Sequence, residues 1–255
     1  MDDNQFIRYY RHILLDEIGE QGQQRINDAK VVIIGVGGLG CPASQYLAAS
    51  GVGHIALIDP DKIELSNLQR QILYCQEDIG EHKVLVAATR LAQINPTIRI
   101  TPVVADITQS NLTDTLHAAD VVLDCTDNHT ARLTINRLCL ETQTKLVSAA
   151  AMGTQGQLIC FDFSHGLGPC YQCLFPDDHQ TRQGCEQQGV FSPLLGVMGS
   201  MQAAQALQML IGKSPQIDRL HRFDMFGVLL QSLTLNTEPD CQCCSAKAAQ
   251  STIIQ

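Results

Sequence analysis

Three clusters of glycine or polar residues each follow a short apolar run, and their residue types suit nucleotide chemistry. The first consists of three glycines with G-x-G-x-x-G spacing directly after the β-branched run 31–34, namely Gly35, Gly37 and Gly40. In a strand–turn–helix context such glycines allow close backbone approach, and the helix N-terminus presents free N–H groups to phosphate. Asp59 ends the next apolar run, 54–58, where a carboxylate can accept hydrogen bonds from ribose hydroxyls. This pattern predicts a nucleotide-binding βαβ unit.

The second and third clusters supply charge for phosphate groups. The second occupies the polar loop after Asp59 and the start of the next helix, and its members are Asp61, Asn67, Arg70 and Lys83. The third is the sequence CTDN at 125–128, directly after another apolar run. Either Asp127 or Asn128 should cap the helix that follows, a role that both residue types fill well. Asp127 is also the candidate Mg²⁺ ligand, because Mg²⁺ favours one or two carboxylates together with phosphate oxygens.

Cysteine spacing predicts a metal centre in the last third of the chain. Two C-x₂-C pairs fit four thiolates around a tetrahedral structural Zn²⁺, and their members are Cys170, Cys173, Cys241 and Cys244. The pairs are farther apart than in a zinc ribbon, so the site would clamp two remote segments. Cys243 could replace a neighbour as ligand, and a set of idle surface thiols is the alternative to a metal site.

Cys185 lies in a long polar segment, 176–190, that shows no periodicity. A loop of this length in a compact domain is usually functional or disordered. An exposed thiol there could be reactive, and an inert loop cysteine is the alternative interpretation.

Strand-like and helix-like runs alternate through the first two thirds of the chain, as in a doubly wound α/β fold. The expected strands are 31–34, 54–58, 98–105, 119–124, 145–151, 157–163, 219–226 and 228–235. The expected helices are 3–15, 20–28, 42–50, 84–94, 109–118, 129–140 and 193–211. In an open sheet the carboxyl ends of parallel strands form one edge, so the three clusters should face one crevice. The last two strands should pair antiparallel around Gly227.

These elements predict a Rossmann-like α/β fold with a mostly parallel sheet, an N-terminal helical cap and C-terminal antiparallel strands. We expect one domain over 1–255. Its parts would be a helical cap at 1–28, a nucleotide-binding core at 30–163, a zinc-clamped crossover loop with helix and strands at 164–244, and a disordered tail at 245–255.

Composition argues against several classes of protein. The net charge of −9 makes long nucleic acid an unsuitable partner, so phosphate chemistry must rest on a few placed cations. No apolar run is long enough for a membrane span and the charged N-terminus lacks a signal-peptide pattern, which predicts a cytoplasmic protein. The 11 cysteines mostly lie singly in apolar runs, which favours a reducing compartment with some cysteines on metal over a disulfide framework.

From about Arg8 to Cys244 the chain resembles the ThiF/MoeB family of ubiquitin-activating-enzyme-like adenylyltransferases. The resemblance is carried by the order of five features: GVGGLG, SNLQRQ, Lys83, CTDN and the two cysteine knuckles. The resemblance implies ATP-dependent adenylation of the C-terminal glycine of a small ubiquitin-like sulfur carrier protein. It also implies a homodimer in which Arg11 reaches the ATP site of the neighbouring subunit. A sulfurtransferase is then a candidate sulfur donor.

The same resemblance implies roles for individual residues. Gly38 and Asp59 would hold the adenosine portion of ATP, and Asp127 would bind Mg²⁺ with Asn128 beside it. Contacts to ribose and phosphates would come from Asp61, Asn67, Arg70 and Lys83. Cys185 matches the crossover-loop cysteine that ThiF-like members use in sulfur transfer, whereas adenylation is sufficient in MoeB-like members.

Two carriers remain open. CLFPDD and DEIGEQGQQ are more similar to ThiF-like members, which serve thiamin (thiazole) biosynthesis with a ThiS-type carrier, and this interpretation is favoured. GCPASQYLA is more similar to MoeB-like members, which serve molybdenum cofactor biosynthesis with a MoaD-type carrier. A non-catalytic nucleotide-binding scaffold is a further alternative, and the retained Arg70, Lys83 and Asp127 argue against it. An NAD oxidoreductase is the last, and the chain offers no evident hydride-site residues for it.

Overall fold

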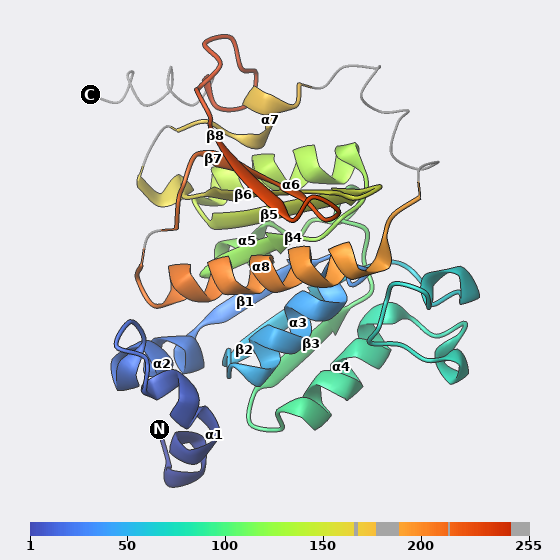
Figure 1. Cartoon of the computed structure of the whole chain (residues 1–255), viewed down its shortest axis with the longest axis vertical. Helices are drawn as coiled ribbons and strands as arrows, with labels where there is room; N and C mark the ends of the chain where they lie inside the picture. Colours follow the sequence, from blue (N-terminus) through green and yellow to red (C-terminus); the bar gives the residue numbers. More distant parts are fainter. Residues whose placement is uncertain (166–167, 177–188, 214, 246–255) are drawn as a thin grey trace.

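One eight-stranded sheet runs through the part of the chain that the computed structural model describes, which is residues 1–165, 168–176, 189–213 and 215–245 (Figure 1). The strands are β1 (Lys30–Ile34), β2 (His54–Ile58), β3 (Arg99–Val103), β4 (Val121–Asp124), β5 (Lys145–Met152), β6 (Gln155–Phe161), β7 (Arg219–Asp224) and β8 (Leu229–Thr234). Their order across the sheet is β3-β2-β1-β4-β5-β6-β7-β8. The first five in that order pair in parallel, and β6, β7 and β8 join antiparallel. The predicted Rossmann-like sheet with C-terminal antiparallel strands is therefore confirmed.

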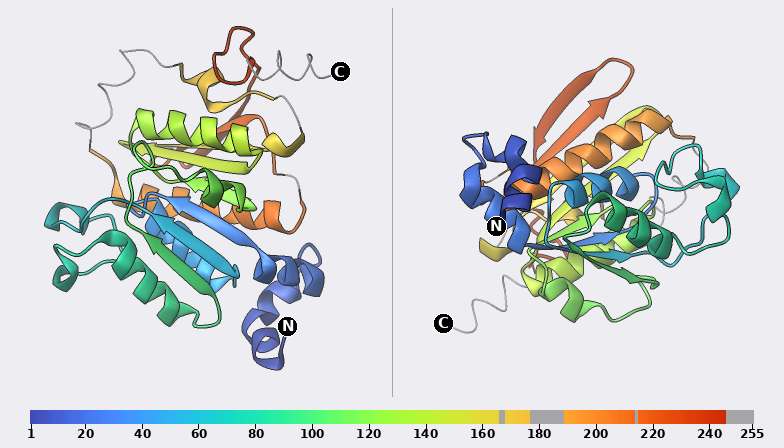
Figure 2. Two further views of the ribbon diagram at one scale, coloured as in Figure 1. Left: turned by 180° about the vertical axis from the view of Figure 1, so that it is seen from behind. Right: turned by 90° about the horizontal axis from the view of Figure 1, so that it is seen from below.

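Helices cover both faces of this sheet. The α-helices are α1 (Asp3–Ile13), α2 (Gly19–Asp28), α3 (Gly40–Ala49), α4 (Lys83–Ile94), α5 (Thr113–His117), α6 (His129–Thr142), α7 (Tyr171–Leu174) and α8 (Ser192–Leu210). Short 3₁₀ helices are η1 (Leu65–Asn67), η2 (Gln76–Asp78) and η3 (Phe163–His165). Figures 1 and 2 show α3, α4 and α8 on one face, with α5 and α6 on the other.

Two apolar cores follow from this arrangement, one on each face. Val31 and Ile33 of β1 pack into the core with α3, α4 and α8, whereas Val32 and Ile34 pack into the core with α5 and α6. A strand that is covered on both faces must be apolar at every position, which explains the unbroken apolar run of β1.

Register places three loops together at one edge. Ile34 of β1 pairs with Ile58 of β2 on one side and with Asp124 of β4 on the other. The three strands therefore end level with one another, and the segments that follow them start side by side. These segments carry the glycine turn, the polar loop after β2, and CTDN.

The predicted elements are present, and one differs markedly in extent. The helix predicted over 109–118 forms only at Thr113–His117. Asp106 accepts hydrogen bonds from Thr108 and from the Gln109 side chain, and these contacts hold the preceding residues in a turn. The other predicted boundaries lie within about two residues of the observed ones, as is usual at element ends. Within the described ranges, no helix has the length and apolar character to cross a bilayer.

Candidate active site

Close packing requires the glycines of the turn after β1. Gly35 has φ +87°, and a Cβ there would lie 2.7 Å from the carbonyl oxygen of Cys125. A Cβ on Gly40 would lie 2.1 Å from the carbonyl oxygen of Gly35. A Cβ on Gly38 would approach the Leu195 side chain of α8 to 2.7 Å, so this helix confines the position. The turn leads directly into α3, where Cys41 N and Ala43 N already donate to Gly37 O and Leu39 O and Pro42 has no N–H. The backbone donors left for a phosphate are the N–H groups of residues 37–40, which have no hydrogen-bond partner within the described ranges.

Asp59 lies where β2 ends and is only 5% exposed. Its Oδ2 accepts a hydrogen bond from Val36 N at 2.7 Å, and its Oδ1 accepts one from Asp61 N at 2.8 Å. Burial raises the pKa of Asp59, while the Lys83 ammonium and these two hydrogen bonds oppose the rise. A carboxylate oxygen has a second lone pair, so Asp59 can still accept from a ribose hydroxyl.

Lys83 joins the loop after β2 to the start of α4. Its Nζ donates to Asp61 Oδ2 at 2.8 Å, and its side chain is 8% exposed whereas that of Asp61 is 63% exposed. The ammonium is thus held near the buried Asp59, on whose pKa its charge acts. The sequence placed these three residues in one site, and the structure brings them together.

Asn67 and Arg70 shape the same loop through local hydrogen bonds. Asn67 Oδ1 accepts from Glu64 N at 3.2 Å, and Arg70 Nη1 donates to Ser66 O at 2.9 Å. A guanidinium has five N–H donors, so this single bond leaves others for phosphate. Whether either residue contacts ATP stays a prediction.

Asp127 lies in the loop between β4 and α6, beside the glycine turn. Asn128 is the N-cap of α6, and its Oδ1 accepts from Ala131 N at 2.8 Å, which confirms the predicted cap. Asp127 is exposed, and no residue of the described ranges donates a hydrogen bond to its carboxylate. An exposed carboxylate without hydrogen-bond partners fits Mg²⁺, which binds one or two carboxylates and takes its remaining ligands from phosphate and water.

Arg11 is not brought to this edge in its own chain. It is exposed in the last turn of α1. Two hydrogen bonds hold that helix to the segment just before β3: Arg8 Nη1 donates to Ile94 O at 3.2 Å, and Asn95 Nδ2 donates to Tyr9 Oη at 2.9 Å. The helix therefore lies at the edge where the parallel strands begin. Any contact of Arg11 with a nucleotide would have to be made with another copy of the chain.

The two cysteine knuckles meet at the far end of the sheet from α1, near α7 in Figure 1. The sulfur atoms that gather there, all within 4.8 Å of one another, belong to Cys170, Cys173, Cys241 and Cys244. Measured Sγ–Sγ distances are 3.9 Å (Cys170–Cys173), 3.7 Å (Cys170–Cys241) and 3.4 Å (Cys173–Cys244). Four sulfurs about 2.3 Å from one Zn²⁺ at the corners of a tetrahedron lie about 3.8 Å apart, so the cluster fits zinc.

Cys243 lies beside this group and interacts with Cys170, but it is not one of the four gathered sulfurs and has a contact of its own. Asn136 of α6 donates through Nδ2 to Cys243 Sγ at 3.3 Å and accepts through Oδ1 from Tyr171 N at 2.9 Å. One fully buried amide thereby ties α6 to both knuckles. The geometry favours Cys241 and Cys244 over Cys243 as ligands, as the spacing did.

Most single cysteines in the described ranges are buried and poorly suited to nucleophilic chemistry. Burial raises the pKa of Cys41 and of Cys160 to about 12 in each case, and it raises those of Cys125 and Cys139 as well. A thiol with a raised pKa is rarely a thiolate at neutral pH. Cys185, the predicted reactive thiol, lies outside the described residues, as does the predicted disordered tail from residue 246 onward.

Comparison with known proteins decides the family. The sequence profile of the ThiF family matches residues 9–245. The chain belongs to the ThiF family. It is 44% identical to the sulfur carrier protein ThiS adenylyltransferase of Escherichia coli K12, over 98% of this chain and 99% of the relative. It is 40% identical to the molybdopterin-synthase adenylyltransferase of the same organism, over 96% of this chain and 98% of the relative.

The fold is shared with a more distant solved structure. A crystal structure of E. coli MccB with ATP superposes with a TM-score of 0.79 at 25% identity, covering 95% of this chain and 75% of the other. The ThiF-family assignment and the sheet architecture therefore agree.

Sequence reasoning missed several residues that build this ThiF-family site. Tyr74 Oη donates to Val36 O at 2.7 Å, on the peptide next to the one that binds Asp59. Gln71 is 4% exposed beside Gly37, and its amide oxygen has no hydrogen-bond partner within the described ranges. Gln202 of α8 is fully buried and donates to the carbonyl oxygens of Asp124, which ends β4, and of Val147 within β5. Of these residues, only Gln71 carried a sequence signal, because it ends the motif SNLQRQ. The contacts of Tyr74 and Gln202 join distant segments and have no local pattern.

Proposed function

We propose that this ThiF-family protein uses ATP and Mg²⁺ to adenylate the C-terminal carboxylate of a small ubiquitin-like sulfur carrier protein. The observation that carries the proposal is the convergence of Asp59, Lys83 and the glycine turn with the Asp127 loop at one edge of the sheet. An acidic protein has little reason to gather a buried lysine beside such a turn unless an anion binds there. The names of the two E. coli relatives support the same activity.

The reaction joins a carrier carboxylate oxygen to the α-phosphorus of ATP and breaks the bond from that phosphorus to the bridging oxygen, so pyrophosphate leaves. The nucleophile is ionised at neutral pH, so no general base is required. Catalysis must come from positioning and from neutralising the anions that meet. Mg²⁺ bound to Asp127 would supply charge to the phosphates when present.

The chain's own residues divide this work by location. The backbone N–H groups of the glycine turn, residues 37–40, would bind phosphate, and Asp59 would accept from the ribose. Lys83 and Arg70 would face the phosphates, with Asp61 orienting Lys83 through their 2.8 Å ion pair. Asn67 would complete the ribose side of the site. An NAD oxidoreductase or an inactive scaffold would need neither cation at this edge.

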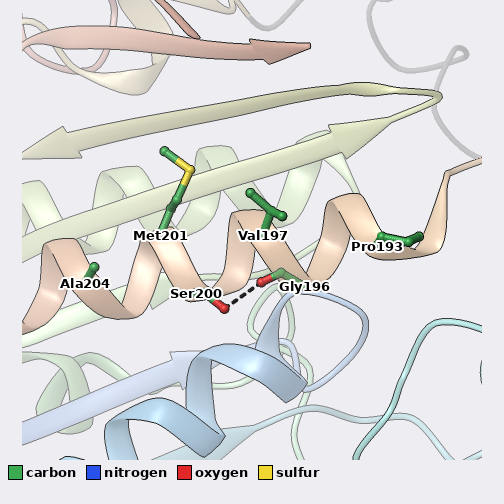
Figure 3. Close-up of a pocket in the computed structure, with 6 residues that line it drawn as sticks. All are labelled: Pro193, Gly196, Val197, Ser200, Met201 and Ala204. Atoms are coloured by element: carbon green, nitrogen blue, oxygen red, sulfur yellow. Dashed lines mark hydrogen bonds between the residues drawn. The ribbon is translucent and has the colours of Figure 1, made fainter. Parts of the chain in front are cut away.

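We also propose a homodimer that completes the site with Arg11. Arg11 lies at the wrong edge of its own sheet, on a helix that leaves large apolar side chains exposed: Ile7 (73%), Tyr10 (46%) and Leu14 (56%). A shallow groove of about 540 Å³ also runs along the outer side of α8 (Figure 3). Its lining is mostly apolar and consists of Pro193, Gly196, Val197, Ser200, Met201 and Ala204. A second copy covering both surfaces would bury them and bring Arg11 across the interface.

The cysteine cluster is proposed to hold a structural zinc ion. The four sulfurs leave no coordination position for substrate, which is typical of structural rather than catalytic zinc. Zinc there would clamp the segment before the crossover loop to the segment after β8. We also propose that the chain forms one domain with three parts: the helical cap, the nucleotide-binding core and the part that zinc would clamp.

Between the two carriers we favour the ThiS type, which serves the thiazole of thiamin, with the MoaD type of molybdenum cofactor biosynthesis as the second candidate. The slightly higher identity to the ThiS adenylyltransferase, 44% against 40%, supports this preference. In the ThiS-type route Cys185 would take part in sulfur transfer after adenylation, with a sulfurtransferase as donor.

Carrier-dependent exchange of labelled pyrophosphate into ATP tests the function and the choice together. The purified protein is assayed with a ThiS-type carrier, with a MoaD-type carrier, and with neither. Faster exchange with the ThiS-type carrier is expected, and the reverse order would favour the MoaD-type assignment. A Cys185→Ser variant should keep exchange but lose sulfur loading, and wild-type sulfur loading in that variant would exclude a role for this thiol.

A further inference from the structure

Asp124, the last residue of β4, is a buried carboxylate that accepts hydrogen bonds from the loop that carries Asp127 and from the neighbouring strand β5. It is 1% exposed. Its Oδ1 accepts from Thr126 N at 3.1 Å and from Thr126 Oγ1 at 2.7 Å, and its Oδ2 accepts from Ser148 Oγ of β5 at 2.7 Å. Three donors therefore satisfy a group that would be costly to bury without partners.

The rest of the loop is fastened from other elements. Cys125 N donates to Ile34 O of β1 at 2.8 Å, and Cys125 Sγ donates to Gln202 Oε1 of α8 at 3.3 Å. The Thr126 carbonyl oxygen accepts from Arg132 Nη2 of α6 at 2.6 Å. Residues on both sides of Asp127 are thus fixed, because Asn128 is held in turn as the cap of α6.

We propose that Asp124 is a positioning residue for Asp127. By holding both the backbone N–H and the hydroxyl of Thr126, it sets the direction in which the chain presents the next carboxylate to metal-bound nucleotide. The proposal rests on the proposed function of Asp127 as the Mg²⁺ ligand. Asp127 itself needs this support, since its own carboxylate has no hydrogen bond within the described ranges.

Hydrogen-bond donors face both side-chain oxygens of Asp124, and a carboxylate can accept from all of them. Thr126 offers two donors to one oxygen, and the Ser148 hydroxyl offers the third to the other oxygen. An asparagine could keep the Thr126 contacts through its Oδ1, and the Ser148 hydroxyl could rotate to accept from the amide. An alanine would lose all three contacts and leave buried donors without a partner.

Isothermal titration of ATP into the full-length protein, with Mg²⁺ and then with EDTA, tests the proposal. The ratio of the two dissociation constants is the gain in ATP affinity that Mg²⁺ provides. Asp124→Ala should reduce this gain about 10- to 100-fold, the usual effect of losing a group that orients a metal ligand. Its affinity for ATP in EDTA should stay within about twofold of wild type, because the glycine turn and Asp59 are untouched. Asp124→Asn should recover most of the gain.

Asp106 provides a matched control. It forms the same Asp-x-Thr turn, with Oδ1 accepting from Thr108 N at 2.8 Å and from Thr108 Oγ1 at 2.7 Å, but it is half-buried and follows β3, which β2 and β1 separate from β4. Asp106→Ala should leave the Mg²⁺ gain unchanged. If Asp124→Ala is not folded, Ser148→Ala, which removes one of the three contacts, should show a smaller loss of the same kind.

Several results would overturn the positioning role. One is a folded Asp124→Ala or Ser148→Ala protein whose ATP affinity still gains as much from Mg²⁺ as that of wild type. Another is an equal loss of this gain in Asp124→Ala and Asp124→Asn, or an equal fall of ATP affinity with and without Mg²⁺. The last is a wild-type protein whose ATP affinity does not change with Mg²⁺. Failure of the proposed function is seen separately. In that case no carrier supports pyrophosphate exchange. The ATP titrations with and without Mg²⁺ do not depend on a carrier, so the Asp124 variants still decide the role of Asp124.

Discussion

Replacing Lys83 with methionine should separate catalysis from stability. The Lys83 side chain is 8% exposed, and its Nζ pairs at 2.8 Å with Asp61, whose side chain is 63% exposed. An ion pair with one exposed partner contributes only about 0–1 kcal/mol to folding. Burying an ammonium costs several kcal/mol, and methionine fills a similar volume without a charge. At a pH where Asp59 is protonated, the free energy of unfolding of Lys83→Met should therefore lie within about 1 kcal/mol of wild type, or above it.

The same substitution should be severe for the reaction. A unit charge about 4 Å from a phosphate charge interacts by about 4 kcal/mol at an effective dielectric constant of about 20. Since about 1.4 kcal/mol corresponds to a factor of ten in rate, the upper bound is roughly 1000-fold. Loss of single stabilising groups in comparable sites costs about 100- to 1000-fold. We therefore expect carrier-dependent pyrophosphate exchange to fall by about that range.

The stability of Lys83→Met should depend on pH more strongly than that of wild type, because of Asp59. Burial raises the pKa of Asp59 in the folded protein, and the Lys83 charge is the foremost influence that opposes the rise. A folded pKa above the unfolded value means that the folded state binds more protons, so stability falls as pH rises from the unfolded to the folded pKa. Without Lys83 this pKa rises further, and Lys83→Met should lose more stability than wild type across that window.

Pyrophosphate exchange and thermal unfolding at several pH values measure both effects. Lys62→Met is the matched control, because it removes the same charge from an exposed neighbour of Asp61. It should leave both exchange and unfolding close to wild type. The assignment of Lys83 to the phosphates is refuted if its exchange rate falls less than about tenfold, or if Lys62→Met is equally impaired.

Two further predictions concern the zinc cluster and the dimer. Cys170→Ser should lose zinc by elemental analysis and unfold at a lower temperature, because thiolate binding of the metal is coupled to folding, whereas Cys243→Ser should keep zinc. Protein purified without chelator that contains no zinc would contradict this. Mixing Arg11→Ala with Asp127→Ala subunits should restore part of the exchange activity that each variant lacks, since heterodimers hold one site without a lesion. No recovery after demonstrated subunit exchange would exclude action of Arg11 across an interface.

Local patterns predicted the parts of the site that local chemistry determines. Gly35 adopts a positive φ and Gly40 packs against the Gly35 carbonyl oxygen, both within one strand–turn–helix unit, so their spacing alone revealed them. Asp59 follows directly from the end of β2. The meeting of the three clusters followed from the rule that parallel strands end at one edge, and the aligned register of β1, β2 and β4 fulfils it.

Contacts between distant segments could not be predicted in the same way. Asp124 looked like the last residue of a strand, and its role depends on Ser148, which only strand pairing places beside it. Gln202 lies within the predicted helix 193–211, yet its side chain is buried and donates to Asp124 O of β4 and Val147 O of β5. The helix predicted over 109–118 was too long, because Asp106 stabilises a turn that competes with helix formation.

Mass spectrometry of the carrier tests the central claim most directly. The purified protein is incubated with ATP, Mg²⁺ and a sulfur carrier ending in its C-terminal glycine, with inorganic pyrophosphatase added to draw the reaction forward. We predict that the intact carrier gains the mass of one adenylyl group, that a carrier lacking the terminal glycine does not, and that Asp127→Ala protein yields none. An unmodified carrier of either type, with wild-type protein that is folded and binds ATP, would contradict the proposed adenylation.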